Sequence, residues 1–86
     1  MNKEEKIKKE IDFLALQVLY IVELTGYSPF NLKTDYFLVR TLDGRDITVK
    51  TAYLRVRKNV NYLDSELLEK INKQPCIFKP LKKDCN

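Results

Sequence analysis

The sequence predicts an α+β fold in a single domain that spans residues 1–86. Three observations predict it: an apolar heptad repeat near the N-terminus, an Asp-Gly turn between two alternating segments, and a second apolar repeat that ends before Pro75. A chain of 86 residues lies within the size range of one domain and has a thin core. In chain order we expect a long helix over residues 3–25, a three-stranded antiparallel meander over 35–58, a short helix over 63–73 and a basic tail over 79–86.

The long helix is predicted by its ends and by its apolar spacing. Asn2 is a good N-cap, Glu5 stands three residues later as in a capping box, and Gly26 is a natural stop. Apolar residues recur at heptad spacing, and we refer to them as the heptad stripe: Ile7, Ile11, Leu14, Val18 and Ile21. A second apolar stripe runs along another side of the helix: Phe13, Leu16, Tyr20 and Leu24.

A helix that is apolar on two sides must be covered on two sides. The rest of the chain supplies one layer of cover, so we expect a second copy of the chain, or a different protein, to supply the other. We expect the heptad stripe to form that interface, because its Ile, Leu and Val residues make a self-complementary surface suited to a two-fold dimer. The sequence leaves open which stripe faces the sheet.

The hairpin is predicted by its turn. Residues 41–45 read Thr-Leu-Asp-Gly-Arg, which fits a type I turn followed by a left-handed glycine. This loop sets the predicted register, which has five pairs: Thr41 with Arg45, Arg40 with Asp46, Val39 with Ile47, Leu38 with Thr48 and Phe37 with Val49. Residues 53–58 alternate again, and we expect a bend near residues 50–52 followed by a third strand.

The C-terminal part is predicted to hold one short helix. Asp64 or Ser65 is its expected cap, and it runs through Asn72 with Pro75 beyond its end. Its expected inner face is made of Leu63, Leu67, Leu68 and Ile71. Residues 76–78 read as a short edge strand before the frayed tail.

The composition argues against most catalytic chemistry. There is no His, and only two Cys and two Gly are present. These counts exclude a four-ligand zinc site and a glycine-rich phosphate loop, and they leave a cysteine nucleophile without a His partner. We therefore expect no enzyme activity, no cofactor and no metal.

The net charge of +4 is concentrated in residues 33–58, which hold seven basic and three acidic side chains. A basic face with an aromatic residue can bind nucleic acid by stacking bases and pairing with phosphates. The plain alternative is a solvated outer face of the sheet. Five residues are expected to share this face and to bind nucleic acid or an acidic partner: Arg40, Lys50, Tyr53, Arg55 and Arg57.

We expect a cytoplasmic protein. The N-terminus mixes both charge signs and has no small-residue cleavage site after its apolar stretch, and charges interrupt residues 11–24, so neither a signal peptide nor a membrane span is expected. In that compartment Cys76 and Cys85 would be free thiols.

The expected function is that of a non-enzymatic interaction module, homodimeric, which binds and regulates another macromolecule. From its small size and its composition rich in Lys, Ile and Asn, we expect a phage or mobile-element protein that acts on a host machine. Nucleic-acid binding through the basic face is the alternative function.

Overall fold

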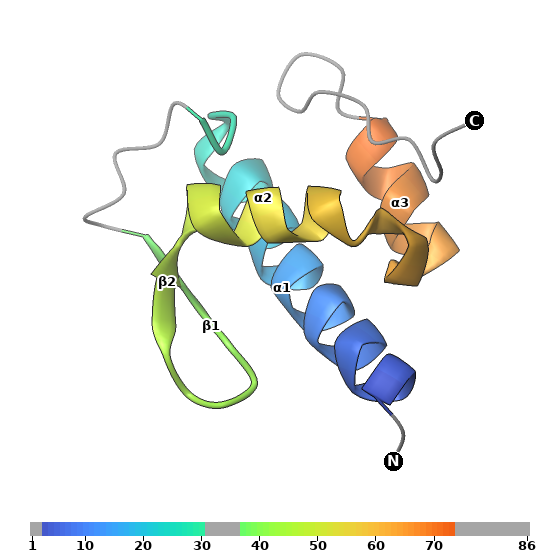
Figure 1. The fold of residues 1–86 in the computed structure, drawn as a ribbon. Coiled ribbons are helices and arrows are strands. Elements are labelled where there is room, and N and C mark those ends of the chain that lie inside the picture. The colour runs from blue at the N-terminus through green and yellow to red at the C-terminus, as the bar shows by residue number, and fades with distance from the viewer. Residues whose placement is uncertain (1–2, 31–36, 74–86) are drawn as a thin grey trace.

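The computed structural model describes residues 3–30 and 37–73. The fold is mixed helix and strand, as predicted. Figure 1 shows α2 lying across α1, with the hairpin at one end of α2 and α3 at the other. The elements in chain order are α1 (Lys3–Thr25), β1 (Leu38–Arg40), β2 (Asp46–Thr48), α2 (Val49–Lys58), the 3-10 helix η1 (Val60–Tyr62) and α3 (Ser65–Asn72).

The predicted long helix is confirmed, and its bounds are those of α1. Gly26 ends it with a φ of +77°, and its N–H donates to the Val22 carbonyl over 2.8 Å. A positive φ of this kind is the usual C-terminal stop, and it favours glycine because glycine has no Cβ. The expected cap at Asn2 lies outside the described residues.

The hairpin turn and four of the five predicted pairs are confirmed, Thr41 being joined to Arg45 by a backbone hydrogen bond. Leu38 pairs with Thr48, Val39 with Ile47 and Arg40 with Asp46. In the turn, the Gly44 N–H donates to the Thr41 carbonyl over 3.0 Å, the Thr41 N–H donates to the Arg45 carbonyl over 2.8 Å, and Gly44 has a φ of +87°. The predicted pair of Phe37 with Val49 is wrong, because Val49 already begins α2.

The predicted third strand over residues 53–58 is wrong, because this segment lies inside α2. Thr48 caps the helix: its Oγ1 accepts a hydrogen bond from the Thr51 N–H over 3.1 Å. The buried residues of α2 follow the i, i+3, i+4, i+7 spacing of a helix face: Val49, Ala52, Tyr53 and Val56. The sheet therefore has two strands among the described residues.

The predicted second helix is confirmed as α3, and Asp64 is its cap. The Asp64 carboxylate accepts from the Glu66 N–H over 3.1 Å. The Asp64 N–H in turn donates to the Asp12 carboxylate over 2.8 Å, which ties the start of α3 to the middle of α1. The expected inner face is buried as a set: Leu63, Leu67, Leu68 and Ile71. The expected edge strand over residues 76–78 and the tail over 79–86 lie outside the described residues.

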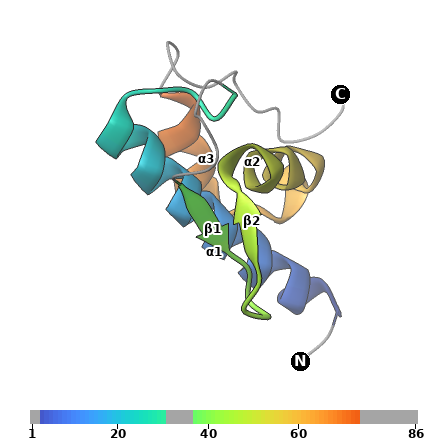
Figure 2. The same cartoon turned by 90° about the vertical axis from the view of Figure 1, so that its left-hand side faces the viewer.

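The core forms where α1 meets the other elements. Figure 2 shows the hairpin alongside α1, with α2 packed next to it. The Tyr53 ring is fully buried and meets the Phe30 ring edge to face, with 5.5 Å between centroids. α1 therefore has one face turned into the core, and its opposite face defines the site described next.

Candidate functional site

The outer face of α1 carries a row of exposed apolar side chains. Phe13 is 37% exposed, Leu16 52%, Tyr20 68% and Leu24 66%. We call these four residues the outer stripe. They are the second stripe recognised in the sequence, and none of the described elements buries them.

The heptad stripe, which was predicted to be the interface, lies on the other side of α1. Leu14 and Val18 are 0% exposed, and Ile11 and Ile21 are buried with them. Ile7 is partly buried and packs against the same core. The prediction that these five residues face a partner is wrong, because α2, η1, α3 and the hairpin cover them within one chain.

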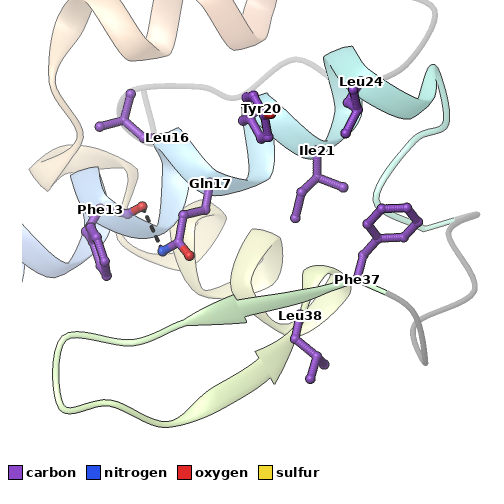
Figure 3. Close-up of a pocket in the computed structure, with 8 residues that line it drawn as sticks. All are labelled: Phe13, Leu16, Gln17, Tyr20, Ile21, Leu24, Phe37 and Leu38. Carbon is purple, nitrogen blue, oxygen red and sulfur yellow. Dashed lines mark hydrogen bonds between the residues drawn. The ribbon is translucent and has the colours of Figure 1, made fainter.

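A groove of about 490 Å³ runs beside the outer stripe, between α1 and the start of β1. Figure 3 shows Phe37 pointing across the groove toward Ile21 and Leu24 of α1, whereas the Leu38 side chain points away from the helix. Leu38 lines the groove from β1 and is 51% exposed. The lining residues are Phe13, Leu16, Gln17, Tyr20, Ile21, Leu24, Phe37 and Leu38.

Gln17 holds the helix and the strand together at this groove. Its Nε2 donates to the Arg40 carbonyl over 2.8 Å, and its Oε1 accepts from the Arg40 N–H over 2.9 Å. Nε2 also reaches the Phe13 carbonyl over 3.2 Å. The side-chain amide thus satisfies both backbone groups of Arg40 and fixes the distance across the groove. Nothing in the sequence pattern distinguished this glutamine from a solvated one.

No family model, curated protein or solved structure matches this chain. The site is therefore argued from its own geometry. Within residues 3–30 and 37–73, no three His, Cys, Asp or Glu side chains gather to hold a metal ion. None of the helices in the same residues is long and apolar enough to cross a membrane.

The residues expected on a basic sheet face are divided between a strand and a helix. Arg40 is on β1, where it pairs with Asp46 over 3.3 Å, while Lys50, Arg55 and Arg57 are on α2. Lys50 and Arg57 are exposed, and Arg55 is partly buried. The placement of Tyr53 on this face is wrong, because helical geometry turns its ring into the core.

α2 is nevertheless a basic helix. It holds Lys50, Arg55, Arg57 and Lys58, and it contains no acidic residue. None of these four takes part in the ion pairs formed among the described residues. The Arg57 guanidinium instead stands 6.0 Å from the centroid of the Tyr53 ring.

Two titratable groups are perturbed, and both have structural causes. The Thr41 hydroxyl and the nearby Arg45 hold the pKa of Asp43 below its usual value at the hairpin turn. Burial raises the pKa of the Tyr53 phenol above 10.0. Neither group faces the outer stripe or its groove, so the chemistry of this surface is apolar contact.

Proposed function

We propose that this chain is a non-enzymatic interaction module that binds another protein through the outer stripe and the adjoining groove. The observation that carries the proposal is the continuous apolar surface on α1. Three of its four side chains are more than half exposed, and the groove beside them is also lined by Phe37 and Leu38. A contiguous patch of large apolar side chains is uncommon on a monomer and marks an interaction site.

The groove gives this surface shape as well as area. Its two walls are held together, because the Gln17 side chain joins α1 to the backbone of β1 by two hydrogen bonds. A preformed apolar groove lowers the ordering needed on binding. We propose that the module acts in the cytoplasm and regulates its partner by occupying a surface of it.

The test compares two glutamate substitutions at equally exposed leucines. Leu16 is 52% exposed on the outer stripe, and Leu42 is 50% exposed at the hairpin turn. Leu16→Glu should abolish binding through the stripe because it puts a charge at the centre of an apolar contact, and Leu42→Glu should leave binding intact. Circular dichroism should show the same helix content in both.

The measurement is association, read in two ways. Light scattering after size exclusion reports contact between copies, and comparative purification reports any protein retained by the wild type and Leu42→Glu but lost with Leu16→Glu. Either stripe-dependent loss supports the proposal. If all three proteins give the same masses and the same retained proteins, the outer stripe is not a docking surface.

A second function, nucleic-acid binding, is favoured by one observation, the run of cations on α2. We propose that Lys50, Arg57 and Lys58, with Arg55 beside them, would contact phosphates. Tyr53 contributes no base stacking in this version of the proposal because its ring is buried.

Salt distinguishes this second function from apolar docking. Phosphate binding weakens steeply as salt rises, because it releases counterions. The wild type should retard DNA or RNA in low salt, and Lys50→Glu combined with Lys58→Glu should not. The control, Lys3→Glu with Lys70→Glu, makes the same charge change on α1 and α3. A wild type that retards neither nucleic acid in low salt removes this function.

A further inference from the structure

We infer that the partner seated on the outer stripe is a second copy of this chain, with the two α1 helices antiparallel. The inference rests on the proposed function and names the occupant of its surface. It is carried by the order of side chains along the stripe and by the charges at its two ends.

The outer stripe is self-complementary when it is reversed. Leu16 and Tyr20 lie two residues on either side of position 18, and Phe13 and Leu24 lie five and six residues from it. A two-fold axis near that position therefore places Leu16 opposite the partner's Tyr20, and Phe13 opposite the partner's Leu24. Each aromatic ring then meets a leucine, which allows close packing.

A parallel pair gives a poorer match. Each side chain would then face its own copy, so that the two Phe13 rings meet, as do the two Tyr20 rings, and no aromatic ring meets a leucine. Side-chain size therefore favours the antiparallel pair.

The charges along this face also favour reversal. Lys9 stands one turn before Phe13, at the N-terminal end of the stripe, and Glu23 borders its C-terminal end. Both are exposed, and neither takes part in the ion pairs formed among the described residues. In the antiparallel pair the lysine end of each helix lies toward the glutamate end of the other. The two helix dipoles also point in opposite directions, which is the favourable arrangement.

The length and the neighbouring groove suit a helix-to-helix contact. From Phe13 to Leu24 the stripe extends roughly 16 Å at 1.5 Å per residue. Helices that pack at an angle near 20° keep contact over such a length, with their axes about 8–10 Å apart. The groove of about 490 Å³ beside the stripe gives the partner's aromatic rings space next to Leu38.

Disulfide trapping tests the direction of the pair. In a background with Cys76→Ser and Cys85→Ser, Phe13→Cys and Leu24→Cys are made as separate proteins and then oxidised alone or mixed. The antiparallel pair brings positions 13 and 24 together but holds two copies of position 13 roughly 16 Å apart along the axis, beyond disulfide reach. The mixture should therefore form covalent dimers at least about fivefold more than either protein alone, because only it holds both reacting positions.

A cysteine at Leu42, whose exposure of 50% matches that of the stripe, gives the background of random oxidation. The wild type should have twice the monomer mass by light scattering, and Leu16→Glu should reduce it to the monomer mass. These results together support the antiparallel second copy.

Three results would overturn the inference, and they differ in whether the proposed function survives. Covalent dimers from each cysteine protein alone would show a parallel pair. A monomeric wild type with no trapping above background would remove the second copy, yet the proposed function would stand if comparative purification still finds a protein lost with Leu16→Glu. A dimer that persists in Leu16→Glu and traps no cysteine pair would show that the two copies meet at another surface. The stripe would then lose its docking role only if comparative purification also finds no protein lost with Leu16→Glu.

Discussion

Gly44 shows how one residue sets the hairpin. Its φ is +87°, and no heavy atom lies within 4 Å of where a Cβ would be, so the constraint at this position is backbone strain and not space. Gly44→Val should lower the free energy of unfolding by about 1 kcal/mol or more, because a β-branched residue resists positive φ. Gly44→Asn is the control, since Asn tolerates that conformation better. Equal urea midpoints for the valine and asparagine variants would contradict this account of the turn.

Tyr53 gives the fold a dependence on alkaline pH. Burial raises the pKa of its phenol above 10.0, so the folded chain binds this proton more tightly than the unfolded chain does. The stabilisation is complete below pH 10.0 and is lost as the pH rises toward the folded pKa. Tyr53→Phe, which cannot ionise, should therefore lose less stability than the wild type in urea unfolding between about pH 9 and about pH 11.

Tyr27 supplies the control for this titration, because it is 61% exposed. Tyr27→Phe should follow the wild-type decline. If Tyr53→Phe and the wild type declined in parallel, the ionisation of Tyr53 would not be coupled to folding.

Residues at turns and caps were the most predictable from sequence. Gly26, Gly44 and Asp64 all act as expected, because their effects are local and depend on a few neighbouring backbone groups. The sequence pattern places Tyr53 on the basic outer face of a sheet and indicates no role for Gln17. Both depend on contacts made with distant parts of the chain, namely Phe30 for Tyr53 and Arg40 for Gln17, and no local pattern reports such contacts.

At the scale of elements, α2 is where sequence and structure disagree. Residues 53–58 alternate as a strand does, but Val49, Ala52, Tyr53 and Val56 also repeat with helical spacing. A segment this short fits both patterns, so the residue that caps its first turn and the surface on which it packs decide between helix and strand. Thr48 provides a cap and α1 provides an apolar surface, and together they favour the helix.

The cap makes this explanation testable. Thr48→Ala should lower the free energy of unfolding by about 1 kcal/mol, because the Thr51 N–H loses its acceptor at the first turn of α2. Thr48→Ser keeps the hydroxyl and should lose much less. Thermal unfolding followed by circular dichroism measures both, and similar midpoints for the two variants would mean that the cap does not decide the helix.

At the scale of the whole molecule, α1 has one apolar stripe that is buried in the core and one that is exposed. Leu14 is 0% exposed in the core, whereas Leu16 is 52% exposed on the outer stripe. Leu14→Ala should lower the free energy of unfolding by about 2–5 kcal/mol through the cavity that it leaves. Leu16→Ala should change the stability of the monomer by less than about 0.5 kcal/mol and should weaken association instead.

Urea unfolding at low protein concentration, with light scattering at high concentration, separates these two effects. A large loss of monomer stability in Leu16→Ala would mean that the outer stripe is covered by its own chain. The sequence showed correctly that two stripes exist and that a small domain covers one of them. It did not show which, because that depends on the side from which α2 and the hairpin approach α1.

The double hydrogen bond between Gln17 and the backbone of Arg40 has a consequence for the way copies of this protein meet. An open strand edge offers unpaired N–H and C=O groups to any extended chain, and such edges are where domain swapping and fibril growth begin. Here a helix side chain occupies both groups of Arg40 that face away from β2, in the place that another strand would take. The two-stranded sheet is thus capped at Arg40 and cannot grow from that residue into a neighbouring molecule. At this position a neighbouring chain finds no free backbone group to pair with, so a contact made there depends on side chains, whose shapes can exclude a wrong partner.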